Sequence, residues 1–258
     1  MKSYGSTDPL VGEHETSMAY KKAPVVEAVC EFRLPPDTLW DGTIAGLMWG
    51  KLQRTFPDKD SRIVNEVVLT KNAGVMNQTL KPDERVRLFT EDKNRYVQIG
   101  TRLVSIHNLK HFEAWERDFE PAINEVFDEL NAVVHPDAFQ RIGLRFINRI
   151  EIPKKSDLAE YFAFRPLVDQ DLRGNVKNLI VGCVFEFRNR DACKVQLSDV
   201  PSEGGNDTYI LDLDYFLKQP KAVSVDQAIQ WVNDAYRKIV QIFDKCTTDK
   251  LKQTFDVI

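Results

Sequence analysis

Alternation of apolar and polar residues marks two long segments of the chain as strands that have one face on a core. In the first, Val25–Leu34, every second residue is apolar, and charged residues occupy three of the positions between. The second, Gln140–Ile152, places Ile142, Leu144 and Phe146 on one face in the same way. Strict alternation over such a length is typical of a half-buried strand. The inward residues of the first strand are Val26, Ala28, Cys30, Phe32 and Leu34.

After the first strand the pattern changes to helical spacing and then to short apolar runs. Asp37 or Thr38 can cap a helix that reaches about Phe56. Turn formers separate the apolar runs so closely that only an antiparallel meander can connect them, because parallel crossovers need a dozen or more residues. The meander strands are expected at Ile63–Thr70, Gly74–Leu80, Arg85–Thr90, Tyr96–Gly100 and Leu103–His107.

Two long helices are predicted, one in each half of the chain. The first runs from about Phe112 to Asn131, and Pro121 inside it predicts a kink or a break that restarts the helix. The second starts at about Ser224, where Ser224 and Gln227 have the spacing of a capping box. Their inward residues are Trp115, Phe119, Ile123, Val126, Phe127 and Leu130, and Ala228, Trp231, Val232, Ala235, Ile239, Ile242, Phe243 and Cys246.

The remaining elements of the second half repeat the order of the first half in shortened form. The second long strand is followed by a helix of one or two turns, a long loop, a hairpin, a further strand and, after the long helix, a last short helix. The short helix is expected at Asp157–Phe162 and the long loop at Ala163–Asn178. The hairpin consists of Leu179–Phe187 and Ala192–Leu197 around Arg188–Asp191. The further strand is Thr208–Phe216, after the Pro201–Asp207 loop, and the last helix is Asp249–Phe255.

The two halves therefore predict an internal duplication. When Pro35 is aligned with Pro153, three aligned positions carry opposite charges: Glu27 with Arg145, Glu31 with Arg149, and Arg33 with Glu151. The expected fold is α+β, with helices on one face of an antiparallel sheet and two similar halves across a pseudo-two-fold axis. The element order is similar to that of the TATA-binding protein, in which the first strands of the copies are neighbours. The expected bounds are a loosely ordered tail over 1–19, a first half over 20–134 and a second half over 135–258.

Composition and charge narrow the class of protein. The net charge of −4 over 258 residues gives no general footprint for nucleic acid or anionic membranes. No run approaches the roughly 18 apolar residues of a membrane helix, and the N-terminal segment lacks the apolar core of a signal peptide. The scattered cysteines form no CxxC pair, so free thiols in a reducing compartment are expected. We therefore expect a soluble cytoplasmic protein.

Charged residues of the two central strands are the first candidate site. If these strands are neighbours, their charges lie on one face and set the register as a ladder of ion pairs, each contributing about 0.2–1 kcal/mol. The alternative is a polar patch that binds an anion or a partner, since Arg141, Arg145 and Arg149 are four residues apart and share a face. The candidate binding residues are Glu27, Glu31, Arg33, Arg141, Arg145 and Arg149.

Two carboxylates, Asp212 and Asp214, share one face of a predicted strand and are the candidates for a metal site. Such a pair could hold Mg²⁺ or Mn²⁺, with Asp199 and Glu203 as the nearest further ligands. The alternative is a solvated strand face. His107 and His111 have the spacing of the two zinc ligands of an HExxH helix. Here they straddle the end of a strand and no Glu follows the first His, so a zinc site is not favoured. No GxSxG elbow, Cys/His pair, P-loop or GxGxxG occurs, so no catalytic residue and no cofactor is assigned.

A nucleic-acid-binding module is a third hypothesis. Arginine interleaved with apolar and aromatic residues between Arg141 and Arg149 is a pattern that some single-strand binders use. Phe146, however, has the parity of the buried face, and the net charge is negative. Core packing is therefore the preferred interpretation of this aromatic residue.

The opening motif Tyr20-x-x-Ala-Pro-Val-Val-Glu-Ala-Val-Cys-Glu-Phe-Arg33 resembles the start of a sporadically distributed family of bacterial and archaeal proteins of roughly this length. The similarity continues in the segment RIGLRFINRI from Arg141, in Leu211–Asp214 and in the closing helices. Where that family often has a histidine in the last long helix, this chain has Tyr236. The resemblance implies a prokaryotic protein without an established activity, and the patchy distribution suggests a defence or toxin–antitoxin setting.

Taken together, the sequence predicts a binding or accessory protein rather than an enzyme. We expect a protein partner or a small ligand on the sheet face between the halves, no membrane association, and no general affinity for nucleic acid; homo-oligomerisation is left open. The alternatives are a metal-dependent enzyme acting on nucleotides or nucleic acid through Asp212 and Asp214, with Arg145 or Arg149 on phosphate, and the nucleic-acid-binding module above.

Overall fold

The structure is a computed structural model that describes residues 23–72, 75–109, 114–167, 177–187, 190–202 and 204–255. Several sequence predictions fall outside these ranges: the tail over 1–19, His111, the helix start at Phe112, the middle of the Ala163–Asn178 loop and the candidate ligand Glu203. In the part that is described, no helix combines the length and the apolar character needed to cross a membrane.

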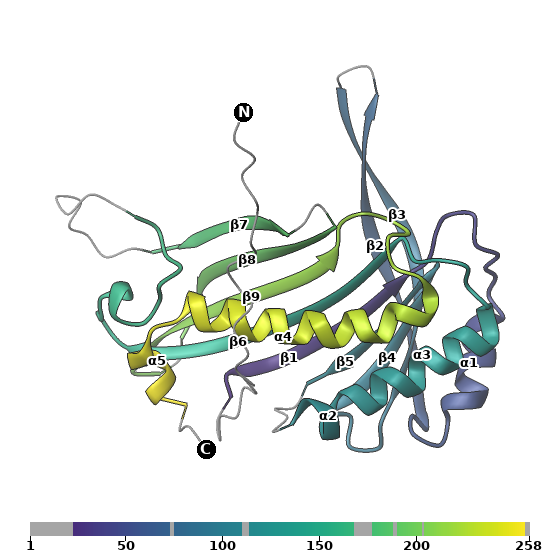
Figure 1. Cartoon of the computed structure of the whole chain (residues 1–258), viewed down its shortest axis with the longest axis horizontal. Helices are drawn as coiled ribbons and strands as arrows, with labels where there is room; N and C mark the ends of the chain where they lie inside the picture. The colour runs from purple at the N-terminus through teal and green to yellow at the C-terminus, as the bar shows by residue number, and fades with distance from the viewer. Residues whose placement is uncertain are drawn as a thin grey trace, which may run out of the picture.

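One nine-stranded sheet forms the body of the molecule (Figure 1). Its order is β2-β3-β4-β5-β1-β6-β9-β8-β7, and every neighbouring pair is antiparallel. From the centre outward, the first half follows the order β1-β5-β4-β3-β2 and the second half β6-β9-β8-β7. The strands are β1 Val25–Arg33, β2 Asp58–Asn72, β3 Val75–Phe89, β4 Arg95–Gly100, β5 Leu103–Asn108, β6 Arg141–Pro153, β7 Ile180–Phe187, β8 Asp191–Val200 and β9 Asn206–Leu217.

The two long strands recognised from alternation, β1 and β6, are neighbours at the centre of the sheet. They pair antiparallel, with Ala28 opposite Phe146 and Arg33 opposite Arg141. The predicted inward parity is confirmed from Ala28 onward but is wrong at Val26, which is 42% exposed. The register shifts between Val25 and Glu27, so Val25 takes the buried position instead.

The predicted meander is confirmed as an antiparallel arrangement, but its first strands are longer than expected. Lys81-Pro82-Asp83 was expected to be a turn, whereas β3 continues through Pro82, which lies opposite Asn65. β4 pairs only with Val86–Phe89 of β3, so one side of β3 carries no partner strand at Pro82. A residue without an N–H is tolerated at such an edge. The hairpin β2–β3 consequently extends well past its neighbours (Figure 1).

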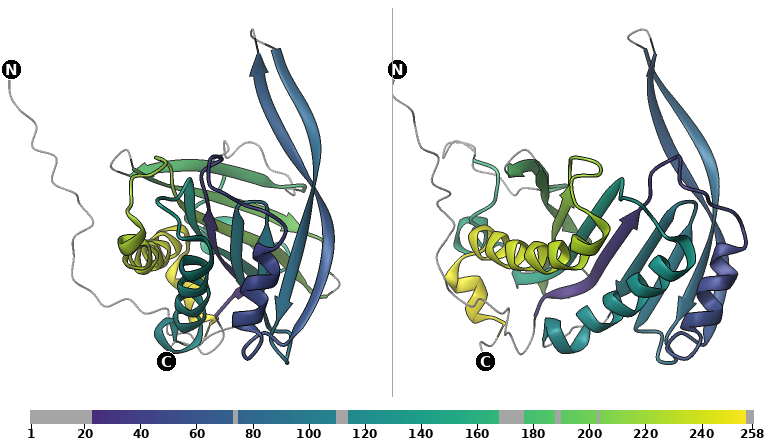
Figure 2. Two further views of the ribbon diagram at one scale, coloured as in Figure 1. Left: turned by 90° about the vertical axis from the view of Figure 1, so that its right-hand side faces the viewer. Right: turned by 45° about the vertical axis from the view of Figure 1, so that its right-hand side comes forward.

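The helices lie on one face of the sheet (Figures 1 and 2). Pro121 breaks the predicted first long helix as expected, because a proline fits only the first turn of a new helix. The capping box is not formed: Ser224 makes no side-chain cap hydrogen bond, and a 3₁₀ turn, η2, precedes the helix. The helical elements are α1 Ile44–Leu52, α2 Trp115–Asp118, α3 Glu120–Val134, η1 Leu158–Glu160, η2 Val225–Gln227, α4 Ala228–Cys246 and α5 Asp249–Gln253.

The first helix, α1, is shorter than predicted. It begins at Ile44 and not near Asp37 or Thr38, and it ends before Phe56. The preceding turn is held by Asp41, whose carboxylate accepts a hydrogen bond from the Thr43 N–H at 2.8 Å. This Asx-type contact gives the backbone an alternative to helix over the residues where a cap was expected.

The hydrophobic core lies between the sheet and the helices. Phe32 of β1 packs against Phe127 of α3 with ring centroids 5.1 Å apart. Trp115 stacks on Tyr236 of α4 at 4.4 Å, and both rings contact Phe146 of β6. Burial of each large side chain of this kind stabilises the fold by about 1.5–3 kcal/mol. The helices therefore cover the apolar face of the central strands, and the charged side chains of these strands lie on the opposite face.

Candidate functional site

Charged side chains of four adjacent strands meet on the sheet face that the helices leave uncovered. Because side chains alternate between faces, Glu27 and Glu31 of β1 lie on this face while Phe32 lies on the other. β5, β6 and β9 add their own alternate residues from either side. The result is a row of ion pairs and hydrogen bonds across β5-β1-β6-β9, which we call the seam. Its members are Glu27, Glu31, Arg33, His107, Arg141, Arg145, Asp212 and Asp214.

Arg141 is the central cation of the seam. Its Nη1 donates to Glu31 Oε1 at 2.8 Å, and its Nη2 donates to Asp214 Oδ1 at 2.7 Å, so one guanidinium links β1 with β9 across β6. The guanidinium lies over Gly143, where a Cβ would collide with it. Glycine at this position therefore gives Arg141 the space to reach both carboxylates.

Arg145 forms the second cross-strand pair of the seam. Its Nε and Nη2 donate to the two oxygens of Asp212 at 2.8 and 2.7 Å, a bidentate geometry that fixes both groups. This hydrogen bonding raises the pKa of the Arg145 guanidinium. Burial raises the pKa of the neighbouring Asp214 carboxyl, although Arg141 opposes the effect. Arg145 keeps 46% of its side chain exposed, so one side of the guanidinium remains accessible.

Glu27 joins the seam to β5 through His107. Its Oε1 lies 2.8 Å from His107 Nδ1, and this hydrogen bond is the main reason that the pKa of Glu27 is lowered; the charge of Arg145 lowers it further. The ring of Tyr96 stacks on His107 at 4.2 Å and holds the imidazole in place. Sequence reasoning treated His107 only as a metal ligand, although alternation along β5 places it on the same face as Glu27.

The pairings differ from those that the alignment of the halves suggested. Glu27 is close enough to Arg145 for that charge to lower its pKa, as expected. Glu31, however, lies opposite Gly143. Arg149 is six residues farther along β6, about 20 Å away. The expected pair of Glu31 with Arg149 is therefore wrong.

The third expected pair also fails to form. Arg33 approaches Glu31 on its own strand at 3.5 Å, and Arg149 pairs with Glu151 on β6 at 3.1 Å. Equivalent positions of two antiparallel strands meet only near the point where the strands cross, which here is Ala28 opposite Phe146. Arg33 and Glu151 are each several residues away from this point, in opposite directions.

Asp212 and Asp214, the candidate metal ligands, are both held by arginines. Among the described residues, no group of three or more His, Cys, Asp or Glu side chains could hold a metal ion. Asp199, one of the expected further ligands, instead accepts a hydrogen bond from the Asn178 N–H at 3.0 Å. The carboxylates that the sequence singled out thus complete ion pairs in this structure.

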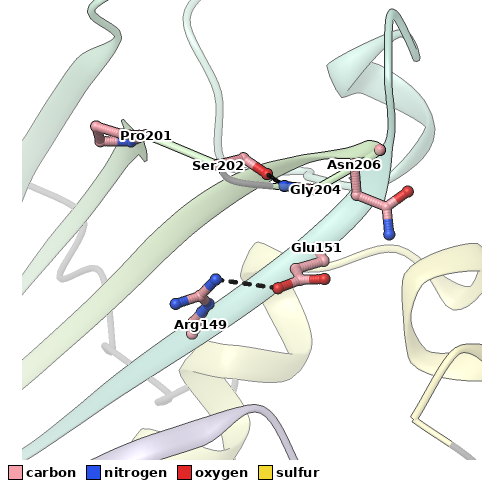
Figure 3. A pocket seen from close by; sticks show the side chains of 7 residues that line it. Arg149, Glu151, Pro201, Ser202, Gly204 and Asn206 are labelled. Carbon is pink, nitrogen blue, oxygen red and sulfur yellow. Dashed lines mark hydrogen bonds and ion pairs between the residues drawn. The ribbon is translucent and has the colours of Figure 1, made fainter.

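A polar pocket lies at the far end of the same face, beyond the seam. It has a volume of about 290 Å³ and lies between β6 and the β8–β9 loop. Figure 3 shows Arg149 and Glu151 on β6 beneath this loop, joined by their ion pair. Arg149 keeps 49% of its side chain exposed. The lining residues are Arg149, Glu151, Pro201, Ser202, Gly204, Gly205 and Asn206.

The aromatic and thiol groups proposed from the sequence lie in the core. Phe146 is fully buried against the helices, as its parity predicted, so it offers no stacking platform to a nucleic acid. All four cysteines are free, and three of them are buried. Burial raises the pKa of Cys246 to about 12 and raises those of Cys30 and Cys193 as well. These three thiols are not nucleophiles at neutral pH.

Comparison with known proteins does not assign the chain to a family. A scan against models of protein families gives no match to the chain, and a search of curated proteins gives none either. Function has to be argued from the uncovered face itself.

Proposed function

We propose that this protein is a binding protein that takes its partner on the uncovered face of the sheet, from the seam to the pocket at Arg149. The observation that carries the proposal is a sheet whose central strands present ordered charges on the face opposite the described helices. Cross-strand ion pairs hold those charges in fixed positions, so a partner meets a preorganised surface. Preorganisation lowers the cost of binding, because little side-chain freedom is lost.

Arg145 and Arg149 are the contact residues in this proposal. Each keeps about half of its side chain exposed. The Arg149–Glu151 pair is exposed and joined by one contact, so it contributes at most about 1 kcal/mol and a partner's anionic group can replace it. We therefore expect the partner to present a carboxylate or phosphate to Arg149. A planar guanidinium suits both groups, because it can donate two parallel hydrogen bonds.

Affinity capture with the purified full chain tests this proposal. Wild-type protein and Arg149→Glu are immobilised and exposed to lysate of the native host, and bound molecules are identified by mass spectrometry. Arg237→Glu is the matched control, because Arg237 is also an exposed, ion-paired arginine but lies on α4, on the helix-covered side. A partner retained by wild type and by Arg237→Glu, but lost by Arg149→Glu, supports the proposal. Equal retention by all three proteins contradicts it.

We also infer that the two halves are copies of one ancestral unit related by a pseudo-two-fold axis, in a topology similar to the TATA-binding protein. The support is positional. Ala28 and Phe146 are equivalent when Pro35 is aligned with Pro153, and they lie directly opposite each other in the β1–β6 ladder. A two-fold axis between antiparallel strands passes through such a pair. The outward strand orders of the halves also agree, apart from the additional strand β2.

The cellular setting of the proposal follows from the chain's chemistry. Four free cysteines fit a reducing prokaryotic cytoplasm, and an accessory role in defence or a toxin–antitoxin system remains the setting that the family resemblance suggests. A metal-dependent enzyme is less well supported, because arginines occupy Asp212 and Asp214. A thermal-shift series with Mg²⁺ and Mn²⁺ distinguishes the two functions, since a metal bound to the native state raises the apparent stability of wild type but not of Asp212→Asn.

A further inference from the structure

A serine, a histidine and a glutamate form a continuous hydrogen-bonded chain on the uncovered face. His107 Nδ1 lies 2.8 Å from Glu27 Oε1, and His107 Nε2 lies 3.0 Å from Ser105 Oγ. Ser105 and His107 are two residues apart on β5 and so share a face, while Glu27 comes from the adjacent strand β1. Both contacts have the length of a good hydrogen bond, and the three groups have the order hydroxyl, imidazole, carboxylate.

The carboxylate determines which imidazole nitrogen can act as a base. An ionised Glu27 only accepts hydrogen bonds, so His107 Nδ1 carries the proton between them. In the neutral imidazole, Nε2 is then the acceptor, and the Ser105 hydroxyl donates to it. The lowered pKa of Glu27 keeps this carboxylate ionised at neutral pH. This is the protonation pattern by which a histidine removes the proton of a serine nucleophile.

The surroundings supply the other parts of such a site. Tyr96 stacks on the imidazole with an angle of 9° between the rings, which restricts its rotation. Gln98 lies directly across the β4–β5 ladder from Ser105. Arg62 Nη2 donates to Gln98 Oε1 at 2.7 Å and so fixes the carbonyl end of the amide, and the Nε2 hydrogens are its remaining donors. A side-chain amide in this role can stabilise an oxyanion.

We propose that Ser105 is the nucleophile of an acyl-transfer site for small carboxylic esters, with His107 as general base and Glu27 as its positioning residue. Ser105 Oγ forms a bond to the ester carbonyl carbon and gives its proton to His107 Nε2. The bond from that carbon to the leaving oxygen breaks, and the leaving alkoxide takes the proton from Nε2. Water then forms a bond to the acyl carbon and loses a proton to Nε2; the bond from that carbon to Ser105 Oγ breaks, which releases the acid, and Ser105 Oγ takes the proton back from Nε2.

Accessibility limits the substrate. Ser105 is 3% exposed and the His107 side chain 12% exposed, so the proposal requires a substrate with a small acyl group. The acyl-transfer site shares Glu27 and His107 with the seam, whereas Ser105 is not a seam residue and Arg149 lies beyond the seam on β6. Ser105→Ala should therefore leave partner capture through Arg149 in place, and Arg149→Glu should leave the labelling of Ser105 in place.

Covalent labelling of the full chain tests the assignment. Purified protein is treated with diisopropyl fluorophosphate, a small organophosphate that serine nucleophiles displace, and the adduct is located by intact-mass and peptide mass spectrometry. We expect a single adduct on Ser105, none there in Ser105→Ala, and labelling at least about 100-fold slower in His107→Gln, the usual scale of a lost general base. Para-nitrophenyl acetate should in turn leave an acetyl group on Ser105 of the wild type.

Two controls distinguish this chemistry from a purely structural hydrogen-bond chain. Ser198→Ala removes another serine, on β8, and in this variant the reagent should label Ser105 at the wild-type rate. Thermal unfolding of each variant establishes that it is folded under the labelling conditions. The proposal is overturned if folded wild-type protein gains no mass at Ser105. It is also overturned if a folded His107→Gln variant labels Ser105 as fast as the wild type.

Discussion

The two faces of the central strands β1 and β6 differ in what they contribute, although their residues alternate one by one. On the covered face, Ala28, Phe32 and Phe146 are completely buried against helices. On the uncovered face, Glu31, Arg141 and Arg145 form ion pairs that remain partly exposed. Apolar burial supplies most of the stability, whereas exposed ion pairs contribute little. The same pair of strands thus supplies core on one face and, on the other, the ion-paired charges on which the proposed binding role rests.

The largest effect that we predict concerns the covered face. Phe146→Ala removes a fully buried ring that packs against both Trp115 and Tyr236 and should lower the free energy of unfolding by about 3–5 kcal/mol. Its neighbour Ile147 lies on the uncovered face, and Ile147→Ala should cost clearly less. Urea denaturation of the two variants measures the difference. Equal costs would show that the two faces do not differ in the way described.

Breaking the bidentate pair on the uncovered face should have an intermediate effect. Asp212→Ala leaves the half-exposed Arg145 without its carboxylate, and we expect a loss of about 1–3 kcal/mol, the range for hydrogen bonds to charged groups. The double variant Arg145→Met with Asp212→Leu should recover part of this loss, because no unpaired charge remains. If the single and double variants unfold alike, the pair carries no coupling energy.

Acidification should distinguish Glu27 from the apolar residues of the same strand. The pKa of Glu27 is lower in the folded protein than its ordinary value, so its contribution to stability is present above that ordinary value and is lost as the pH falls through the folded value. Glu27→Gln should therefore be less stable than wild type at about pH 7, and the difference should shrink toward about pH 3. Unfolding curves across this range measure it. A difference that is independent of pH would contradict the assignment.

The smallest effect on stability is expected at Arg149. Its ion pair with Glu151 is half exposed at both ends, so Arg149→Ala should change the free energy of unfolding by less than about 0.5 kcal/mol. The same variant should nevertheless weaken partner capture in the experiment above. A large loss of stability would instead make Arg149 a structural residue and undermine its use as a probe of binding.

The sequence predicted the parts of the fold that depend on local pattern. Alternation identified β1 and β6, helical spacing identified the buried stripe of α4, and Pro121 located the break before α3. The early start of α1 and the turn at Pro82 were wrong for related reasons. A cap was expected at Asp37 or Thr38, but the turn held by Asp41 delays the helix until Ile44. A turn was expected at Pro82, but β4 does not pair with β3 at this position, so the strand tolerates the proline.

The candidate site was predictable as a set of residues but not as a set of contacts. Parity placed Glu31 and Arg141 on one face of the two central strands, and Asp212 and Asp214 together on one face of another strand, but it did not bring the two sets together. Which carboxylate each arginine reaches depends on the register of three strands and on the open space over Gly143, and neither can be derived from spacing along one strand. Ser105 and His107 carried a usable signal, two residues apart on a predicted strand, but their partner Glu27 is far away in the sequence and comes close only through the β1–β5 pairing.

The pairing of Ala28 with Phe146 has an evolutionary consequence. If the halves descend from one unit that once associated as a symmetric dimer, the residue on the axis faced an identical residue, so two large rings or two small methyl groups had to share that place. Fusion into a single chain removes this constraint, because each copy can then change alone. On this inference, the small Ala28 opposite the large Phe146 is an arrangement that a symmetric dimer could not have held, and it lets a single ring pack against both Trp115 and Tyr236.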